Sequence, residues 1–477
     1  MTATLLRTIG ESTVELLDQE IEGLNQELQG DVLRPDDVGY DEARSVWNGM
    51  IDRRPALIAM CETTDDVVRS VRFARKHNLL TSVRGGGHNI AGTAICEDGL
   101  MISLARMRNI DVDTETKRVK IGPGATWGEV DAMTQPHGLT VPSGIISTTG
   151  VSGLTLGGGW GWLTRSWGYT CDRLRSAEMV TADGEVLRAS ESEHPDLFWG
   201  LRGGGGNFGI VTEFEFEAVP LGPEIVAGMV LYPFERFDEI ADFFTSFTET
   251  APKSVTSLFL SRAAPPLPII PEEVHGDPVV GMVVICSGSI EEGERLLQPV
   301  KDIPGALVDT IKVKPFTEHQ SFLDAGQPHG RHYYWKSEYL SKLNDDVFDA
   351  TKEYCSDLTS PHSALLLMHL GGQGRKSGSK ETGAAYRDAE YACVIQAAWD
   401  PSPESEPHVR WARTFHQEIQ PSSTGHTYVN FLTDDERDPR IRQAFEPEIY
   451  ERLAQVKRKY DPENVFRLNK NIPPANS

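Results

Sequence analysis

Glycine is concentrated in three segments of the chain, residues 82–92, 143–168 and 202–221. The first reads SVRGGGHNIAG, the second contains LGGGWGWL and the third begins with RGGGGNFG. Runs of glycine allow positive φ angles and a close approach of the backbone, so several N–H groups can converge on one anion. A single run would also suit an ordinary tight turn. Three runs together indicate a long ligand bound under the backbone, with a pyrophosphate in its middle.

The residues around the glycines do not fit a nicotinamide-dinucleotide site of the Rossmann type. Such a site needs a strand, then Gly-x-Gly-x-x-Gly at the start of a helix, then an acidic residue about 20 positions later. Here LGGGWGWL follows no clear strand, and GGGGNFG leads into an alternating strand at 211–216. The first run instead follows a strand–helix–strand unit, with strands expected at 56–60 and 79–83 and a helix at 65–76.

The bulk composition is that of a globular protein with more than one domain. The chain has 477 residues, which is too long for one compact core. Its 46 basic and 70 acidic residues give a formal net charge of −24, which argues against nucleic acid and anionic membranes as partners. No apolar stretch approaches a membrane span, and MTATLLRTIGEST lacks the pattern of a signal peptide. Six scattered cysteines without a Cys-x-x-Cys pair indicate neither a disulfide framework nor a metal site, so we expect a cytoplasmic protein.

Glycine becomes sparse after residue 222, where a second domain is predicted to begin. Apolar strands alternate there with helices, which we expect near 235–249, 290–300, 343–357 and 404–418. The final segment reads as a strand, TYVNFL, followed by a helix near 438–458.

The N-terminal residues carry a helical pattern that ends at Gly30. Apolar side chains recur there at steps of three and four residues, at Val14, Leu17, Ile21, Leu24 and Leu28. This spacing predicts an amphipathic helix over 12–29, whose apolar face either packs onto the body of the protein or forms a dimer seam.

A histidine, His88, stands directly behind the first glycine run. Neutral imidazole is a competent nucleophile, and the neighbours Gly87, Asn89 and Gly92 leave room for a planar group. A flavin has an activated methyl group on its benzenoid ring that histidine can capture covalently, which would also make the flavin a stronger oxidant. A loop histidine that is hydrogen-bonded to the backbone fits the same spacing. The residues by themselves leave both interpretations open.

Five motifs occur in one order along the chain: VRGGGHNIAG, PSGIISTTGVSGLTLGGGWGWL, LFWGLRGGGGNFGIVTEFEF, YVNF and YDPENVFRLNKNI. In this order they resemble the berberine bridge enzyme-like oxidases, in particular the bacterial, 6-hydroxynicotine oxidase-like branch. These are FAD-linked members of the vanillyl-alcohol oxidase superfamily. The resemblance is strong over about residues 38–220 and 425–473. It implies an α+β fold, with a split PCMH-type FAD-binding domain and an α+β substrate domain that holds a large antiparallel sheet.

The implied organisation has four parts, with the active site between the two domains. They are an N-terminal helical extension (1–37), the FAD-binding domain (38–221), the substrate-binding domain (222–426) and a C-terminal segment (427–477) that returns to the FAD-binding domain.

The resemblance also implies cofactor contacts, position by position. Residues 83–89 would hold the pyrophosphate with His88 as the covalent attachment, the second glycine segment would follow the ribityl chain, and the C-terminal asparagines would cover the flavin. The implied contacts are Val83, Arg84, Gly85, Gly86, Gly87, His88, Asn89, Ser147, Thr148, Ser152, Gly153, Trp162, Gly209, Val211, Asn430, Asn469 and Asn471.

The chain departs from the family pattern at two positions. Many members form a second link to the flavin through a cysteine where this chain has Ile146, so a single link through His88 is expected. Some relatives use as base a tyrosine at the end of Tyr-x-Asn-Tyr, where this chain has Phe431. In relatives a residue three positions after the attachment cysteine gates oxygen. The chain has the small Thr149 at that place, which favours an oxidase.

Flavin oxidation of an alcohol or amine takes a hydride from carbon, and a base usually takes the neighbouring proton. Tyr428 is the first candidate, since strand alternation would place it on the face of Asn430, and Lys336 would supply a cation to lower its pKa. Tyr386 and Glu381 fall near polar active-site positions of relatives. A packed tyrosine or a surface charge explains each residue equally well, and an amine that binds neutral needs no base. The identity of the base therefore stays open.

We thus expect an FAD-dependent oxidoreductase that oxidises a small or medium-sized amine, alcohol or secondary metabolite, with O2 as acceptor and hydrogen peroxide as product. The alternatives are a flavin dehydrogenase with another acceptor and a flavin-carrying binding protein without turnover. No metal, nucleic acid or membrane is expected as a partner, and the sequence leaves the oligomeric state open. Aromatic residues expected to form a wall of the substrate site are Tyr333, Tyr334, Trp335 and Tyr339.

Overall fold

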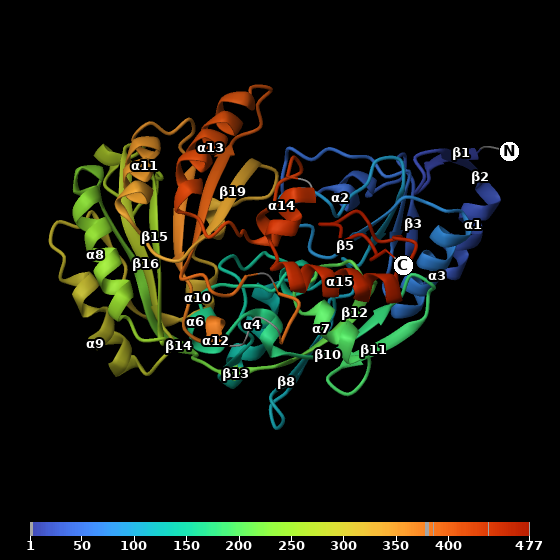
Figure 1. Cartoon of the computed structure of the whole chain (residues 1–477), viewed down its shortest axis with the longest axis horizontal. Coiled ribbons are helices and arrows are strands. Elements are labelled where there is room, and N and C mark those ends of the chain that lie inside the picture. Colours follow the sequence, from blue (N-terminus) through green and yellow to red (C-terminus); the bar gives the residue numbers. More distant parts are fainter. Residues whose placement is uncertain (1–2, 377–380, 385, 437, 477) are drawn as a thin grey trace.

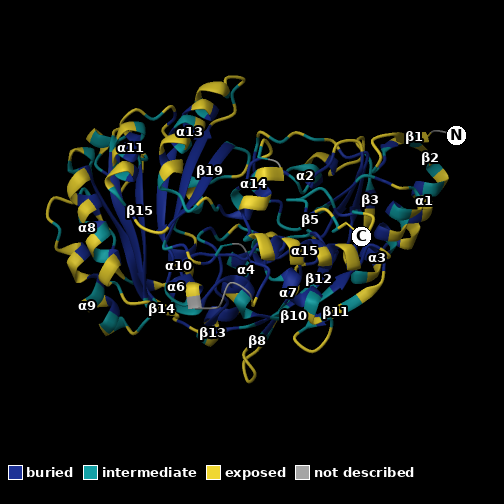
Figure 2. Ribbon diagram, in the orientation of Figure 1, coloured by how far each residue is buried: buried dark blue, intermediate teal, exposed yellow. Residues whose placement is uncertain are grey.

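In the computed structural model, which describes residues 3–376, 381–384, 386–436 and 438–476, the chain forms two halves that lie side by side (Figure 1). One half holds a large sheet with helices on its outer side, and the other holds smaller sheets and both ends of the chain. Strands and inward helix faces are buried, whereas outward helix faces are exposed (Figure 2). The predicted α+β class is confirmed. No described helix is both long and apolar enough to span a bilayer.

The glycine run of the first segment follows strand β5, which belongs to a four-stranded sheet with the order β3-β4-β6-β5. Helix α3 (Thr64–Lys76) joins β4 to β5, and it begins where it does because the Thr63 hydroxyl accepts a hydrogen bond from the Asp66 N–H. The predicted strand–helix–strand unit is thereby confirmed. The strands are β3 (Asp31–Leu33), β4 (Leu57–Met60), β5 (Thr81–Arg84) and β6 (Leu100–Ser103).

The third glycine segment runs directly into the central strand of an antiparallel sheet with the order β11-β10-β12-β8-β7. Phe214 and Phe216 of β12 face the core of this half. The strands are β7 (Ile110–Asp113), β8 (Arg118–Ile121), β10 (Leu174–Val180), β11 (Val186–Ser190) and β12 (Ile210–Glu217). The helices of this half are α1 (Asp18–Glu27), α2 (Tyr40–Arg44), α4 (Trp127–Thr134), α5 (Val151–Leu156), α6 (Thr164–Trp167) and α7 (Pro195–Leu201).

The other half is built on an eight-stranded antiparallel sheet with the order β17-β14-β16-β15-β20-β21-β19, in which β18 also pairs with β14. Its outer face is covered by α8 (Phe237–Thr250), α9 (Ile290–Lys301), α11 (Asp345–Ser356) and α13 (Glu406–Ile419), close to the four predicted ranges (Figure 1). The inner face is turned toward the glycine-rich half. The strands are β14 (Glu224–Pro233), β15 (Val255–Ala263), β16 (Pro278–Cys286), β17 (Val308–Asp309), β18 (Lys312–Pro315), β19 (His332–Leu340), β20 (Ala364–His369) and β21 (Tyr391–Trp399).

The remaining elements are short or lie at the ends of the chain. They are β1 (Ala3–Arg7), β2 (Thr13–Leu17), β9 (Leu139–Thr140), β13 (Val219–Pro220), α10 (Phe316–Gln320), α12 (Gln373–Lys376), α14 (Asp438–Gln443) and α15 (Pro447–Tyr460). The described 3-10 turns are Gln135–His137, Thr170–Arg173, Phe234–Arg236, Glu272–Val274, Asp324–Gly326, Gln420–Ser422 and Val429–Phe431.

The N-terminal extension is only partly helical, contrary to the prediction. β1 and β2 form an antiparallel hairpin, and α1 begins only at Asp18. In β2 the period of two decides burial, so Leu16 is 1% exposed whereas Leu17 is 42% exposed. Ile21 and Leu24 of α1 pack into the core of this half, which favours packing onto the body over a dimer seam.

The segment TYVNFL is not a strand, because residues 429–431 form a 3-10 turn. Tyr428 and Asn430 are therefore not related by strand alternation, although the Asn430 amide donates to the Tyr428 oxygen at 2.9 Å. The helix expected near 438–458 is two helices, α14 and α15. Pro447 starts α15, since proline lacks an N–H and suits the first turn of a helix.

Candidate functional site

A cavity of about 300 Å³ lies between the two halves, and all three glycine segments reach its wall. The inner face of the large sheet and the C-terminal segment supply the rest of the wall. The lining glycines of the three segments are Gly85, Gly86, Gly87, Gly144, Gly150, Gly153, Gly204, Gly205, Gly206 and Gly209. Segments that are far apart in the sequence thus enclose one space.

The first and second glycine segments cross in direct backbone contact. A Cβ atom added to Gly86 would lie 2.5 Å from the Cα atom of Gly150, and one added to Gly150 would lie 2.6 Å from the Cα atom of Gly86. No side chain fits into this crossing, so both positions require glycine. The crossing holds residues 85–88 against the start of α5.

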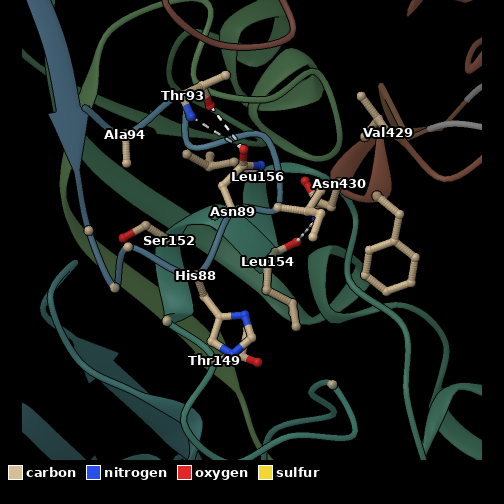
Figure 3. A pocket seen from close by; sticks show the side chains of 18 of the residues that line it. His88, Asn89, Thr93, Ala94, Thr149, Ser152, Leu154, Leu156, Val429 and Asn430 are labelled. Carbon is tan, nitrogen blue, oxygen red and sulfur yellow. Dashed lines mark hydrogen bonds between the residues drawn. The ribbon is translucent and has the colours of Figure 1, made fainter. Parts of the chain in front are cut away.

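The His88 imidazole lies on the cavity wall (Figure 3). Its ring stacks on Trp47 with centroids 4.4 Å apart, and Trp47 stacks on Tyr333 with centroids 3.8 Å apart, which fixes the plane of the imidazole. Burial lowers the pKa of His88 to about 4, so the ring is neutral at pH 7. Its Nε2 atom is buried and has no hydrogen-bond partner among the described residues. A neutral imidazole with a free ring nitrogen is the nucleophilic form of histidine.

Two asparagines hold the loops around this histidine (Figure 3). The Asn89 Oδ1 atom accepts hydrogen bonds from the Thr93 hydroxyl at 3.2 Å and the Ala91 N–H at 3.1 Å. The Asn430 amide donates to the Leu154 carbonyl oxygen at 3.5 Å, which ties the C-terminal segment to α5.

Most of the cofactor contacts implied by the sequence lie on this wall: Val83, Gly85, Gly86, Gly87, His88, Asn89, Ser152, Gly153, Gly209, Val211, Asn430 and Asn469. The others lie off it: Arg84, Ser147, Thr148, Trp162 and Asn471.

The residues off the wall are engaged elsewhere or turned away. Arg84 donates to a carbonyl oxygen of α2, and the Ser147 N–H and hydroxyl both donate to the carboxylate of Asp324. The Trp162 ring packs on His319 with centroids 4.7 Å apart. The Thr148 side chain is exposed, and Asn471 is half-buried. Their placement does not support the contacts that the sequence implied for them.

A buried lysine of α15 positions the third glycine segment. The Lys457 ammonium donates to the carbonyl oxygens of Asn207 at 2.7 Å and Phe466 at 2.9 Å, and to the carboxylate of Asp461 at 2.7 Å. Both charged side chains of the pair are 0% exposed. The Asn469 amide, on the wall, donates to the Gly206 carbonyl oxygen at 3.1 Å. The C-terminal segment thus fixes the loop that precedes β12.

Tyr428 lies on the wall, but the cation expected beside it does not. The Lys336 ammonium lies 3.1 Å from the carboxylate of Glu436 and 3.4 Å from that of Asp435. In β19 neighbouring side chains alternate in direction, so Trp335 lines the cavity while Lys336 faces away from it. Burial raises the pKa of the Tyr428 hydroxyl. The structure therefore corrects the expected activation of Tyr428 by Lys336.

The other candidates for catalysis are divided. Thr149 lies on the cavity wall with His88 (Figure 3). Tyr386 lies off the wall and stacks on His426 with centroids 4.3 Å apart. Glu381 is exposed, and its backbone carbonyl oxygen accepts a hydrogen bond from Arg202. Neither Tyr386 nor Glu381 is placed to act as a base on a molecule in the cavity.

Three of the four residues expected to form an aromatic wall do not line the cavity. Of the four, only Trp335 lines the cavity. Tyr333 stacks on Trp47, Tyr334 faces the outer helices and Tyr339 is buried in the core. The aromatic residues on the wall are Trp160, Trp335, Tyr428, Phe431 and Phe466. The first four contact one another in pairs at ring centroid distances of 4.9 to 5.5 Å.

The sequence did not identify three polar residues that lie in or next to strands of the large sheet. Arg262, His362 and Gln396 line the cavity. The available signal was the alternation of Leu258, Leu260 and Arg262 along an apolar strand, but the sequence does not say which face of that strand meets a ligand.

The wall suits FAD. Glycine backbones converge from three segments, and of the described lining residues none is Asp or Glu, which favours a diphosphate. The Asn469 Oδ1 atom is buried and, like His88 Nε2, has no partner among the described residues. A carboxamide oxygen of this kind is an acceptor for the polar edge of a flavin.

Comparison with known proteins agrees with this assignment. Residues 55–190 match the family described as FAD binding domain, and residues 427–473 match the family described as Berberine and berberine like. The chain is 32% identical to the uncharacterized FAD-linked oxidoreductase YgaK of Bacillus subtilis, over 94% of this chain and 97% of that protein. It is 30% identical to (R)-6-hydroxynicotine oxidase of Paenarthrobacter nicotinovorans, over 94% of this chain and 98% of that protein.

Solved structures show the same fold. The crystal structure of 6-hydroxy-D-nicotine oxidase from Arthrobacter nicotinovorans superposes with a TM-score of 0.83 at 30% identity, covering 94% of this chain and 98% of that one. Berberine bridge enzyme from Eschscholzia californica, at 20% identity, shares the fold with a TM-score of 0.84, covering 96% of this chain and 99% of that one. The glycine-lined cavity, the two matched families and the relatives that align over almost the whole chain agree. The chain belongs to the berberine bridge enzyme-like FAD-linked oxidoreductases, with a PCMH-type FAD-binding domain.

Proposed function

We propose that this FAD-linked oxidoreductase is an oxidase whose flavin is attached covalently through His88 alone. It oxidises a small or medium-sized amine, alcohol or secondary metabolite and passes the electrons to O2, which yields hydrogen peroxide. The observation that carries the proposal is the His88 imidazole, which is neutral, fixed by the Trp47 stack and free at Nε2 on the wall of the cavity.

His88 is suited to bond formation by its protonation state and its fixed plane. Because burial lowers its pKa to about 4, the ring keeps a nitrogen lone pair at neutral pH. The chemistry that bound FAD would supply is uptake of a hydride from the substrate carbon. His88 holds the flavin in place, and the crossing at Gly86 and Gly150 keeps that histidine in register with the second glycine segment.

A single link is supported by the residue at the position where many family members have a second attachment, a cysteine. Ile146 lines the cavity, and none of the described lining residues is a cysteine. Cys171 is buried elsewhere, and burial raises the pKa of its thiol to about 12, so it is not a nucleophile at neutral pH. The six described cysteines are all free and buried, which supports a reducing compartment, and the cytoplasmic location stays a prediction.

The lack of a carboxylate among the described residues of the wall favours an amine among the three substrate classes. Of the described lining residues none is a carboxylate, and burial raises the pKa of Tyr428. An amine that binds in its neutral form can lose a hydride from the adjacent carbon without a base. The relative named as (R)-6-hydroxynicotine oxidase supports a nitrogen-containing substrate for this chain as well.

Acid precipitation tests the flavin link. Wild-type protein, H88A and the control H362A, which removes the other lining histidine, are precipitated with acid, and flavin absorbance is measured in pellet and supernatant. We expect yellow pellets for wild type and H362A and release of flavin from H88A. Flavin in the wild-type supernatant would contradict the covalent link, and no flavin in any sample would contradict binding of FAD in this cavity.

Peroxide yield tests the acceptor. With a substrate that bleaches the flavin, one hydrogen peroxide per substrate oxidised supports the oxidase, and Thr149 on the wall leaves space for O2. Rapid bleaching with reoxidation only by a quinone-type acceptor would indicate a dehydrogenase. Tight ligand binding without bleaching across a substrate panel would indicate a flavin-carrying binding protein.

A further inference from the structure

The inner face of the large sheet carries the positive charge of Arg262, which has no acidic partner among the described residues. Alternation along β15 places Arg262 on the same face as Leu258 and Leu260, and all three line the cavity. Among the described residues its guanidinium makes no ion pair, and its Nε donates only to the backbone oxygen of Ala263, at 3.1 Å. The remaining four N–H donors of this side chain are therefore available to a molecule in the cavity.

The nearby carboxylate of Asp400 is already paired with side chains other than Arg262. Arg331 and His362 share one carboxylate, that of Asp400, at 3.2 and 3.3 Å. Burial, and then the charge of Arg331, lower the pKa of Arg262 to about 10, so the guanidinium is still protonated at pH 7. The chain has 70 acidic residues, yet none of the described lining residues is acidic. An enclosed charge of this kind is costly until an anion pairs with it.

Arg262 also ends a row of side chains that crosses four strands. The strand register aligns Trp335 with Gln396, Gln396 with Ala364 and Ala364 with Arg262, and all four residues line the cavity. Strands lie about 4.8 Å apart, so the backbone of the row spans about 14 Å from β19 to β15. The Gln327 amide donates to the Gln396 side-chain oxygen at 2.9 Å, and the residue paired with Arg262 is the small Ala364.

We propose that the substrate carries a carboxylate, which Arg262 binds as a bidentate ion pair while the planar part of the substrate lies toward Trp335. The inference deepens the proposed function by naming the substrate class. A planar fork of donors matches a carboxylate, and one guanidinium balances one negative charge. The row provides the other contacts, an amide for a polar group and an indole for a ring. Arg262 is thus a specificity-determining residue on the substrate side of the cavity.

Calorimetric titration of the air-oxidised holoenzyme tests this without turnover. The probes are matched pairs that differ only in charge: benzoate and benzamide, indole-3-acetate and indole-3-acetamide, and 3-phenylpropionate and 3-phenylpropionamide. The proteins are wild type, R262Q, R262K and the control R410Q, which removes the same charge from an exposed position of α13. Flavin content and thermal midpoint are measured for each variant.

We expect wild type and R410Q to prefer at least one carboxylate over its amide, and R262Q to lose that carboxylate by roughly 30- to 1000-fold while keeping its affinity for the amide. R262K should recover part of the loss. Equal affinity within every pair, binding of no carboxylate at millimolar concentration, or an unchanged preference in R262Q would overturn the proposal. So would loss of flavin from folded R262Q, since the guanidinium would then serve FAD. The heat of binding is measured without turnover. The titration therefore tests the carboxylate proposal even if the oxidase assay fails.

Discussion

The substitution of Lys457 by methionine tests how the C-terminal segment supports the cofactor cavity. Lys457 is fully buried and joins three partners, namely Asn207 next to the third glycine run, Asp461, and Phe466 ahead of Asn469. Methionine fills a similar volume, so the change removes charge and hydrogen bonds rather than packing. What remains is a buried carboxylate without its cation and an Asn207 carbonyl oxygen without the ammonium donor, whereas the Phe466 carbonyl oxygen keeps a hydrogen bond from the Asn469 amide at 3.0 Å.

The magnitude follows from the contacts that remain. Breaking a buried ion pair by removal of one partner costs about 3–5 kcal/mol. The Asp461 carboxylate keeps hydrogen bonds from the N–H groups of Val465 at 2.8 Å and Phe466 at 2.9 Å, so the lower end of that range is expected. A loss of about 3 kcal/mol corresponds to a drop of roughly 6–12 °C in Tm for a domain of about 200 residues.

Wild type, K457M, D461N and the double variant K457M/D461N are heated, and unfolding is monitored by circular dichroism and by flavin fluorescence. The fluorescence reports the glycine-rich half, which supplies the glycine segments of the cavity wall. The double variant should be more stable than the sum of the single losses predicts, by about 1 kcal/mol or more, since no unpaired charge is left. A drop of less than about 2 °C in K457M, or single losses that add within about 0.5 kcal/mol, would refute the reasoning.

Three further perturbations have defined outcomes. G86A, whose Cβ would clash with the crossing backbone, should lower the flavin-to-protein absorbance ratio severely, while G23A, which meets nothing within 4 Å, should leave the ratio unchanged. Burial raises the folded-state pKa of Asp131 to about 8, so stability falls as pH rises from about 4 to 8, and D131N should raise Tm more at pH 8 than at pH 5; equal shifts at both pH values would contradict this. K336M should leave the pH dependence of flavin reduction unchanged, because Lys336 does not face Tyr428; a shifted profile would restore their pairing.

The local sequence decided much of the glycine-rich half. The Thr63 cap, the helix that it begins and the strand before Arg84 follow from neighbouring residues, and they deliver His88 to a loop. Ordered glycine motifs predicted the family and a shared ligand site, since glycine is needed wherever backbones must touch. The boundary between α14 and α15 is also local, because Pro447 suits the first turn of α15.

Only the tertiary structure decided which side chains meet in the cavity. Lys336 and Trp335 are neighbours in sequence, yet the pleat of β19 sends one to Asp435 and the other to the ligand space. Arg262 and Gln396 lie in one row because three strands, β15, β20 and β21, pair in one register, and pairing between distant segments leaves no local signature. The sequence by itself determined the cofactor class through short-range backbone requirements. The fold determined the substrate surface, because that surface exists only where separate strands and the two halves meet.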